Sequence, residues 1–269
     1  MVQAASEGRY ETLRLEHRDG LAVLSLRRPE AGNAISRELA RELMGATSLL
    51  RSTPTVRAVL LVGEGKNFCV GGDIRGFAAA GGDLPAYIDE LTTMFHTAIS
   101  HLVRLEVPVV AAVQGNAAGG GLALACCCDV VVAAESARFV VAYSTIGLSP
   151  DGSSSMMLPR LIGLRRALDV ALTNRPISAA DALDWGLVSR VVPDDQLAGE
   201  AAELAATLAR GPTKALGAAK RLLRDGWAEG LEVHMQREGA TISALSGTAD
   251  ARDAIAAFLD KRPPSFSGH

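Results

Sequence analysis

Apolar and polar positions divide the chain before residue 195 into two alternating patterns. Short apolar runs, predicted as strands, cover residues 21–28, 56–63, 107–115, 129–135 and 187–193. In residues 36–51 and 84–105 the apolar positions fit helical spacing, which predicts helices. The runs between about 110 and 133 are apolar on both faces and predict a sheet covered on both sides. Strands joined by crossover helices indicate right-handed βαβ units.

Beyond residue 195 the pattern becomes wholly helical, in Ala- and Leu-rich segments that break near Gly211–Thr213 and Asp225–Gly230. Glycine at such breaks is typical of a helix end. We therefore predict an α/β core over residues 1–195 and a helical C-terminal region over residues 196–269.

Composition and charge argue against several classes of protein. The formal net charge of −3 over 269 residues argues against a dedicated nucleic-acid-binding protein. We expect no membrane span, because no apolar run approaches about 18 residues, and no secretory signal, because the first 20 residues lack an apolar region. Three of the four cysteines, Cys126–Cys128, are consecutive, which favours buried thiols in a reducing cytoplasm over disulfides or a zinc site.

Two glycine clusters each follow a predicted strand and lead towards a helix. One is the triplet Gly119–Gly121, and the other lies in Gly63–Phe77. Each cluster by itself also fits a tight turn, and neither has the spacing of a phosphate-binding loop. Together they offer free backbone N–H groups near helix N-termini, where two amides can converge on one oxygen that becomes negative in a reaction.

Several segments follow one another in an order that identifies a family. They are "RPEAGNAIS" from residue 28, "GKNFCVGGDI" from residue 65, "PVVAAVQGNAAGGGLALACCCDVVVAAESARF" from residue 108, "SPDGSSSMMLPRLIG" from residue 149, "ALDWGLVSRVVP" from residue 182 and "AFLDKRPPSF" from residue 257. Over nearly its whole length the chain resembles the crotonase superfamily, the enoyl-CoA hydratase/isomerase family. The resemblance implies a crotonase-like spiral of ββα and βαβ units with a helical trimerisation region. It also implies a homotrimer or a dimer of trimers, a coenzyme A thioester as substrate, and no permanently bound cofactor or metal.

The resemblance also implies a set of site residues. The backbone N–H groups of Gly72 and Gly120 are expected to hold the thioester oxygen and stabilise an enolate. Coenzyme A is expected to contact Glu30, Ala31, Gly32, Val70, Asp73 and Ile74, together with Phe258 and Lys261 from a neighbouring subunit. Candidates for the acyl pocket are Phe77, Met94, Phe95, His96, Tyr143, Met156 and Met157, although core packing also fits the aromatic residues and the methionines. The Asp73 and Asp129 carboxylates are expected to brace loops or form buried ion pairs.

Carboxylates decide which reaction the resemblance favours. Family hydratases use two glutamates, and the matching positions here are Ala123 and Tyr143. Asp151 remains, in an "LSPD" stretch that resembles the isomerases of phenylacetate-type catabolism. Moving a double bond from the 3,4 to the 2,3 position needs a single base, so the sequence favours an enoyl-CoA isomerase that uses Asp151. Asp151 also stands near a helix start, where it could act as an N-cap instead.

Three alternatives stay open at this point. One is a weak or atypical hydratase that works with Asp151 alone. Another is a 4-chlorobenzoyl-CoA-type dehalogenase, whose assisting histidine has its counterpart in His96. That enzyme differs from this chain in having a tryptophan at the position of Tyr143 and a phenylalanine at the position of Gly72. The third is an acyl-CoA-binding protein without catalytic activity.

Overall fold

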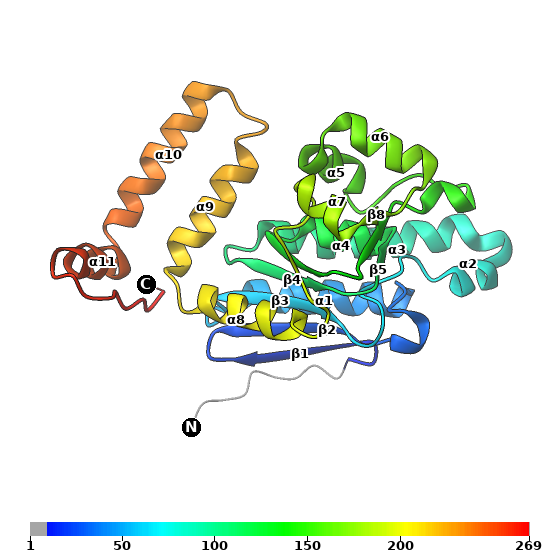
Figure 1. Cartoon of the computed structure of the whole chain (residues 1–269), viewed down its shortest axis with the longest axis horizontal. Coiled ribbons are helices and arrows are strands. Elements are labelled where there is room, and N and C mark those ends of the chain that lie inside the picture. Colours follow the sequence, from blue (N-terminus) through cyan, green and yellow to red (C-terminus); the bar gives the residue numbers. More distant parts are fainter. Residues whose placement is uncertain (1–9, 269) are drawn as a thin grey trace.

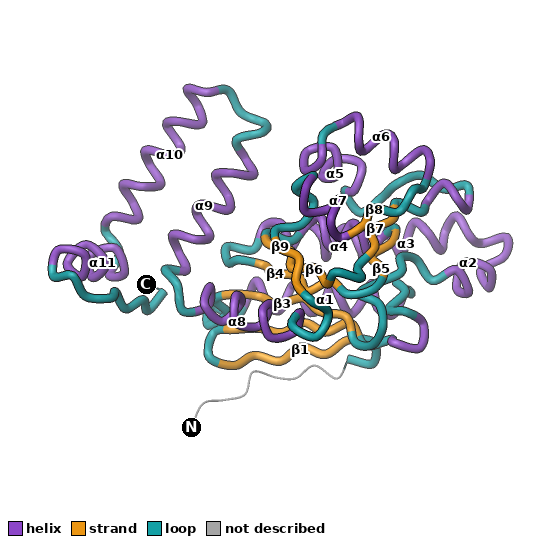
Figure 2. Tube along the Cα trace, in the orientation of Figure 1, coloured by secondary structure: helices purple, strands orange, loops and turns teal. Residues whose placement is uncertain are grey.

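Six strands form the central sheet, in the spatial order β1-β2-β3-β4-β6-β9 (Figures 1 and 2). The computed structural model describes residues 10–268. The strands are β1 Leu13–Arg18, β2 Leu21–Leu26, β3 Ala58–Gly63, β4 Val109–Val113, β6 Val130–Ala134 and β9 Arg190–Val192. β1 and β2 are antiparallel, whereas the other neighbouring pairs are parallel. The mainly parallel sheet confirms the predicted α/β class.

β1 is not among the strands predicted from the sequence. It pairs with β2 across a turn at Asp19 and Gly20, whose φ angles are 51° and 82°. Two positive φ angles in succession are typical of a type I′ hairpin turn, which favours Asp-Gly. The Asp-Gly pair, together with the alternation of apolar and polar residues over residues 13–16, was therefore a usable signal for this hairpin.

Both faces of the sheet are covered, as predicted. On one face, α1 (Arg37–Ser52), α3 (Leu84–Arg104) and α4 (Gly120–Cys127) contribute to the main apolar core. On the other face, α8 (Leu197–Ala209) packs against alternate residues of β3, β4 and β6. The division into two regions at residue 195 stays a prediction. Helix α8 follows residue 195 in the chain but packs on the sheet of the core.

A smaller sheet and several short helices complete the core around the loops that follow the strands. The three-stranded sheet has the order β5-β7-β8, with β5 Asn116–Ala118, β7 Arg138–Val140 and β8 Ile177–Ser178. The remaining core helices are α2 Ile74–Ala80, α5 Ser154–Ile162, α6 Leu164–Thr173 and α7 Ala179–Asp184, with short 3₁₀ helices η1 Pro29–Ala31, η2 Gly81–Asp83 and η3 Tyr143–Ile146.

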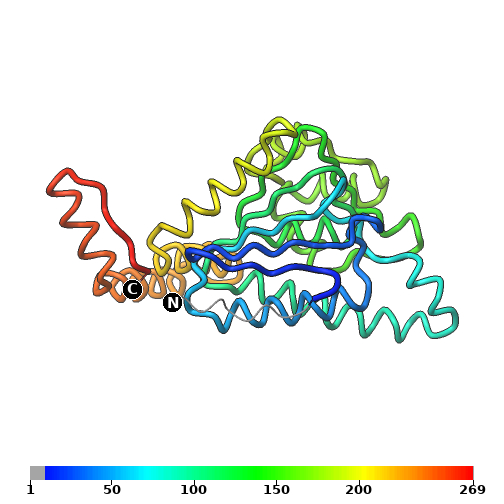
Figure 3. The backbone as a smooth tube through the Cα atoms, turned by 90° about the horizontal axis from the view of Figure 1, so that it is seen from below, coloured from blue at the N-terminus to red at the C-terminus, as the bar shows by residue number. Residues whose placement is uncertain are grey.

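The last three helices project from the core as an arm (Figures 1 and 3). They are α9 Thr213–Asp225, α10 Leu231–Ser246 and α11 Ala249–Leu259. The breaks before α9 and between α9 and α10 fall at the two glycine-containing segments predicted from the sequence. In both views the arm lies at the opposite end of the molecule from α2.

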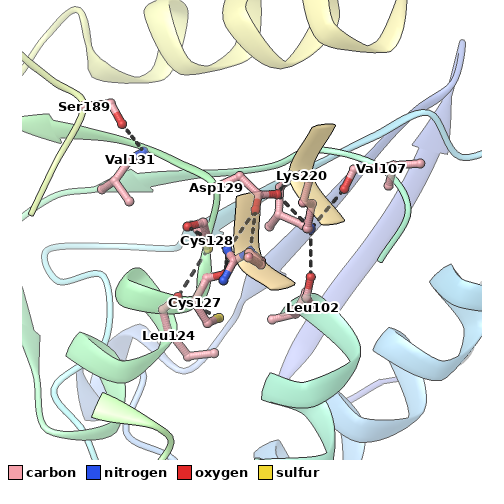
Figure 4. A network of polar contacts seen from close by, with 11 residues as sticks. Leu102, Val107, Leu124, Cys127, Cys128, Asp129, Val131, Ser189 and Lys220 are labelled. Carbon is pink, nitrogen blue, oxygen red and sulfur yellow. Dashed lines mark hydrogen bonds and ion pairs between the residues drawn. The ribbon is translucent and has the colours of Figure 1, made fainter. Parts of the chain in front are cut away.

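A buried ionic network fastens the arm to the core (Figure 4). The Lys220 ammonium of α9 contacts Oδ2 of Asp129 at 2.8 Å and donates to the carbonyls of Leu102 and Val107 at 3.0 and 3.2 Å. Arg224 lies 2.8 Å from Oδ1 of Asp129. Burial lowers the pKa of Lys220, and the Asp129 charge opposes that effect. The expectation of a buried ion pair at Asp129 is confirmed.

The four cysteines are free and buried. Burial raises the pKa of the Cys69 and Cys126 thiols to about 12, so both are protonated at neutral pH. Within residues 10–268, none of the helices combines the length and apolar character that crossing a bilayer requires.

Candidate active site

One cavity of about 380 Å³ lies among the loop after β3, the start of α4, helix α3 and the segment from η3 to Asp151. It is lined by Ile35, Val70, Gly71, Gly72, Ile74, Phe77, Ile88, Leu91, Thr92, Phe95, Gly119, Gly120, Ala142, Tyr143, Thr145, Ile146, Leu148, Ser149 and Asp151. Gly72, Gly120 and Asp151 therefore share one cavity, although they come from three separate parts of the chain.

The loop after β3 presents Gly72 between two anchored neighbours. The carbonyl of Gly71 accepts a hydrogen bond from the Ile35 amide, and the Asp73 amide donates to the Ile35 carbonyl. Among residues 10–268, no hydrogen bond is donated by the amide of Gly72. A side chain at Gly72 would place its Cβ 2.5 Å from Cζ of Phe77, so glycine keeps the cavity open at this point.

Each glycine of the triplet has a different environment. Gly119 has φ 51° and ψ −119°, a conformation that side chains disfavour. A Cβ on Gly120 would lie 2.6 Å from Cδ1 of Ile35, and a Cβ on Gly121 would collide with the Cys69 carbonyl. Gly120 begins α4, so its N–H lies in the first helical turn, where no intrahelical acceptor exists and the helix dipole is positive.

Asp73 braces this loop. Its carboxylate accepts hydrogen bonds from the amides of Arg75 and Gly76 as the N-cap of α2, and it contacts Arg28 at 2.9 Å. Burial alone would raise the pKa of Asp73, but the hydrogen bonds from Arg28 and from the two amides hold it below its ordinary value. The loop-bracing role expected for this carboxylate is confirmed.

Asp151 is held by side chains rather than by a helix end. The Tyr143 hydroxyl donates to Oδ1 at 2.6 Å, and Nε2 of His96 lies 3.3 Å from Oδ2. Helix α5 begins at Ser154, and no side chain caps it. The alternative interpretation of Asp151 as an N-cap is therefore wrong, because its carboxylate bonds to tertiary neighbours.

Tyr143 does more than pack in the core. Burial, followed by the charge of Asp151, raises the pKa of its phenol far above the ordinary value. The phenol thus stays a neutral donor towards Asp151. At the position of the second hydratase glutamate, this chain therefore has a hydrogen-bond donor in place of a carboxylate.

At Ala123, the position of the first hydratase glutamate, the backbone of Gly152 occupies the space that a longer side chain would need. Ala123 is fully buried, and a Cβ built on Gly152 would lie 2.8 Å from Cβ of Ala123 and 2.7 Å from Cε1 of Phe95. Gly152 has φ 59°, which lets the loop after Asp151 approach α4 this closely. A longer side chain at Ala123 would have to displace that loop.

The other predicted pocket residues divide into two groups. Val70, Ile74 and Phe77 line the cavity together with Tyr143 and Phe95. Met94 packs against the apolar core and is absent from the lining, whereas His96, Met156 and Met157 line a second cavity, which Gly152 also borders.

The predicted coenzyme A residues are not gathered in one place of a single chain. Glu30 and Ala31 lie in η1, and Gly32 packs against the Val70 side chain at the cavity. Phe258 belongs to α11 in the arm, with 83% of its surface exposed, and Lys261 follows that helix. Their contribution to a neighbouring subunit's site stays a prediction.

A stripe along α3 supplies cavity residues that were not predicted. Ile88, Leu91 and Thr92 stand on the same helical face as Phe95, at positions i, i+3, i+4 and i+7. Helical periodicity could have indicated this shared face, but not that it borders a cavity. No group of three or more His, Cys, Asp or Glu side chains among residues 10–268 could hold a metal ion.

Comparison with known proteins gives a consistent family. A family model described as enoyl-CoA hydratase/isomerase matches residues 16–269. A solved structure described as a putative enoyl-CoA hydratase/isomerase from Mycobacterium abscessus superposes with a TM-score of 0.92 at 37% identity, over 96% of this chain and 100% of that one.

The similar curated proteins differ in their named reactions. A probable enoyl-CoA hydratase of Rhodobacter capsulatus is 39% identical, over 96% of this chain and 99% of that protein. The 1,2-epoxyphenylacetyl-CoA isomerase of Escherichia coli is 36% identical, over 93% of this chain and 95% of that protein. An Arthrobacter 4-chlorobenzoyl coenzyme A dehalogenase is 34% identical, over 92% of this chain and 90% of that protein. Overall similarity therefore fixes the family, whereas the reaction depends on the side chains in the site.

Proposed function

Because the chain belongs to the enoyl-CoA hydratase/isomerase family, we propose that it moves the double bond of an enoyl-CoA thioester, with Asp151 as its single base. The observation that carries this proposal is the makeup of the cavity. Among the described residues that line it, Asp151 is the only carboxylate, and Gly72 and Gly120 line the same space.

The chemistry follows from these three residues. Gly72 and Gly120 donate their amide N–H groups to the thioester oxygen, which gains negative charge as the enolate forms. Asp151 removes a proton from the α-carbon of a 3-enoyl thioester, and the electrons delocalise into a dienolate. Return of a proton to the γ-carbon leaves the 2-enoyl product. Tyr143 orients Asp151 through its hydrogen bond to Oδ1.

Two features argue against the two-glutamate hydratase mechanism. Ala123 is buried under Gly152, and Tyr143 donates to Asp151, so neither position offers a carboxylate to hold a water molecule. The cavity walls are mostly apolar, with Phe77, Ile88 and Leu91 among them. These walls suit an uncharged, apolar acyl group and exclude water from the enolate.

Oligomerisation belongs to the same proposal. The arm exposes large apolar side chains, including Leu223, Ile242 and Phe258, which are 75%, 70% and 83% exposed. Exposed apolar surface of this extent is typical of a protein–protein interface. We expect a homotrimer or a dimer of trimers, in which Phe258 and Lys261 approach the coenzyme A site of a neighbour.

An assay with two substrates and one variant tests the isomerase proposal. A 3-enoyl-CoA is expected to gain the absorbance of a conjugated thioester, and a 2-enoyl-CoA is expected to keep it. Asp151→Asn should reduce kcat by about 10²- to 10⁴-fold with nearly unchanged acyl-CoA affinity, because the base acts in the transition state. Loss of absorbance from the 2-enoyl substrate would indicate a hydratase. Binding without turnover of either would indicate an acyl-CoA-binding protein.

His96 favours one further candidate, hydrolytic dehalogenation. Its ring lies 3.3 Å from Asp151, so it could assist hydrolysis after that carboxylate had attacked an aromatic carbon. In that reaction a carbon–oxygen bond forms, chloride leaves, and water then hydrolyses the aryl ester. Chloride release from 4-chlorobenzoyl-CoA, lost in Asp151→Asn, would establish this activity in place of the isomerase.

A further inference from the structure

His96 places one ring nitrogen between two groups of opposite hydrogen-bonding character. The Gly152 amide donates to Nε2 at 3.1 Å, and Oδ2 of Asp151 lies 3.3 Å from the same atom. A ring nitrogen carries either a lone pair or a proton. With a lone pair, Nε2 accepts from Gly152, and it takes a proton from Asp151 by giving up that hydrogen bond. With a proton, it donates to the Asp151 carboxylate.

Tyr143 makes the two carboxylate oxygens of Asp151 unequal. Oδ1 already accepts the short hydrogen bond from the phenol, at 2.6 Å, whereas Oδ2 faces His96. A proton taken up on Oδ2 therefore lies beside Nε2. The Gly152 amide favours the tautomer of His96 in which Nε2 carries a lone pair, and a proton transferred from Oδ2 replaces the hydrogen bond from Gly152.

His96 and Asp151 also open into different spaces. Asp151 lines the cavity that holds Gly72 and Gly120, whereas His96 lines a second cavity of about 310 Å³. This second cavity is bordered by His96, Ile99, Ser100, Val103, Arg104, Gly152, Ser153, Met156 and Met157. The His96 side chain is 49% exposed. The pair thus lies between the substrate cavity and a separate one, at which the His96 ring is accessible to solvent.

We propose that His96 lets the proton held by Asp151 exchange with water through the second cavity. The inference rests on the proposed function of Asp151 as the base. His96 acts through Asp151 and does not touch substrate, so it is a positioning residue. It decides whether the proton returned to the γ-carbon is the one taken from the α-carbon or one from solvent.

The proton transfers balance in each direction. The α C–H bond breaks, its electrons enter the dienolate, and an O–H bond forms at Oδ2 of Asp151. Transfer from Oδ2 to Nε2 gives a carboxylate and an imidazolium, and loss of that same Nε2 proton to water at the half-exposed ring leaves neutral His96 in its original tautomer. Uptake of a solvent proton at Nε2 and its transfer to Oδ2 then delivers a solvent proton to Asp151. Without His96, the carboxyl group keeps the substrate's proton until the γ-carbon takes it.

Deuterium incorporation tests this inference in two assays. A saturated acyl-CoA in D₂O reports α-proton exchange without any double-bond shift, and a 3-enoyl-CoA reports deuterium in the isomerised product. We expect wild-type protein to incorporate deuterium in both. His96→Gln can still accept from Gly152 but cannot relay a proton, so exchange should fall by about 10-fold or more while isomerisation persists. Mass spectrometry of the acyl-CoA measures both quantities.

Met156→Leu is the matched control, because it alters the wall of the second cavity and keeps His96. Equal incorporation by wild type and His96→Gln would overturn the inference and leave the isomerase proposal standing. So would isomerisation by wild type without any deuterium uptake. A wild-type protein that neither exchanges nor isomerises would instead refute the proposed function, and the relay with it. Thermal melting of each variant confirms that the fold is retained.

Discussion

Helices α4 and α10 show how differently the two ends of the molecule are stabilised. All eight residues of α4 are buried, whereas none of the sixteen residues of α10 is. α4 begins at Gly120 and is enclosed by the core around the candidate site. α10 carries exposed apolar residues such as Leu231 and Ile242. α4 therefore buries its apolar residues within one chain, whereas α10 leaves its own exposed, as the proposed oligomer requires.

The largest effect on stability is expected where the two regions are joined. Asp129→Ala removes the counter-charge of Lys220 and Arg224, and we expect the free energy of unfolding to fall by about 3–5 kcal/mol. Denaturant unfolding at a fixed protein concentration measures it. Glu106→Gln breaks an exposed ion pair with Arg221 at the same join and should cost about 0–1 kcal/mol. Equal losses in the two variants would contradict the role given to the buried network.

Removing the backbone N–H at the start of α4 should distinguish the catalytic effect of that amide from the effect of a side chain on packing. Gly120→Pro deletes the N–H at the first helical position, where proline is tolerated. The φ and ψ angles of Gly119, 51° and −119°, are the mirror image of the extended conformation that a residue before proline favours, and glycine adopts both forms. We expect kcat to fall by about 10²- to 10³-fold.

Gly120→Ala is the matched variant, since it adds the same Cβ contact with Ile35 and keeps the amide. Steady-state kinetics of both variants distinguish the two effects. If alanine reduces kcat as much as proline does, crowding rather than loss of the amide explains the result.

A charge on the arm should dissociate the oligomer and leave the core folded. We expect Ile242→Asp to shift sedimentation towards smaller species, because a carboxylate would be buried without a partner at the interface. Far-ultraviolet circular dichroism should change little. Leu172 on α6 is at least as exposed, at 77%, and Leu172→Asp should leave the proposed oligomer intact. An unchanged sedimentation coefficient for Ile242→Asp would place the interface elsewhere.

The smallest effect concerns Tyr143 at alkaline pH. Its raised pKa means that the unfolded chain ionises this tyrosine first, so stability should decline as pH rises above about 10. Tyr143→Phe removes this one contribution, and its stability should fall less steeply in that range. Denaturant unfolding at several alkaline pH values measures the two slopes. The tyrosinate absorbance of the folded protein should be the same in both, because Tyr143 stays protonated while folded.

The sequence predicted what depends on short-range patterns. Helical periodicity located α1 and α3 to within two residues at each end. The glycine clusters indicated two loops with free backbone N–H groups, because few other residues allow such close approach, and the family resemblance selected Gly72 and Gly120 within them. The hairpin of β1 and β2 escaped prediction although Asp19 and Gly20 carried its signal.

Local pattern by itself predicted the α/β alternation, the helical C-terminal region and the two glycine loops, and the family resemblance singled out Asp151 as the candidate base. The tertiary structure decided what Asp151 touches. It brings His96, which is 55 residues away in the chain, and Tyr143, which is eight residues away, to opposite oxygens of one carboxylate. It also fills the space beside Ala123 with Gly152. Periodicity and turn preferences act over a few neighbouring residues, whereas these contacts depend on how distant segments pack.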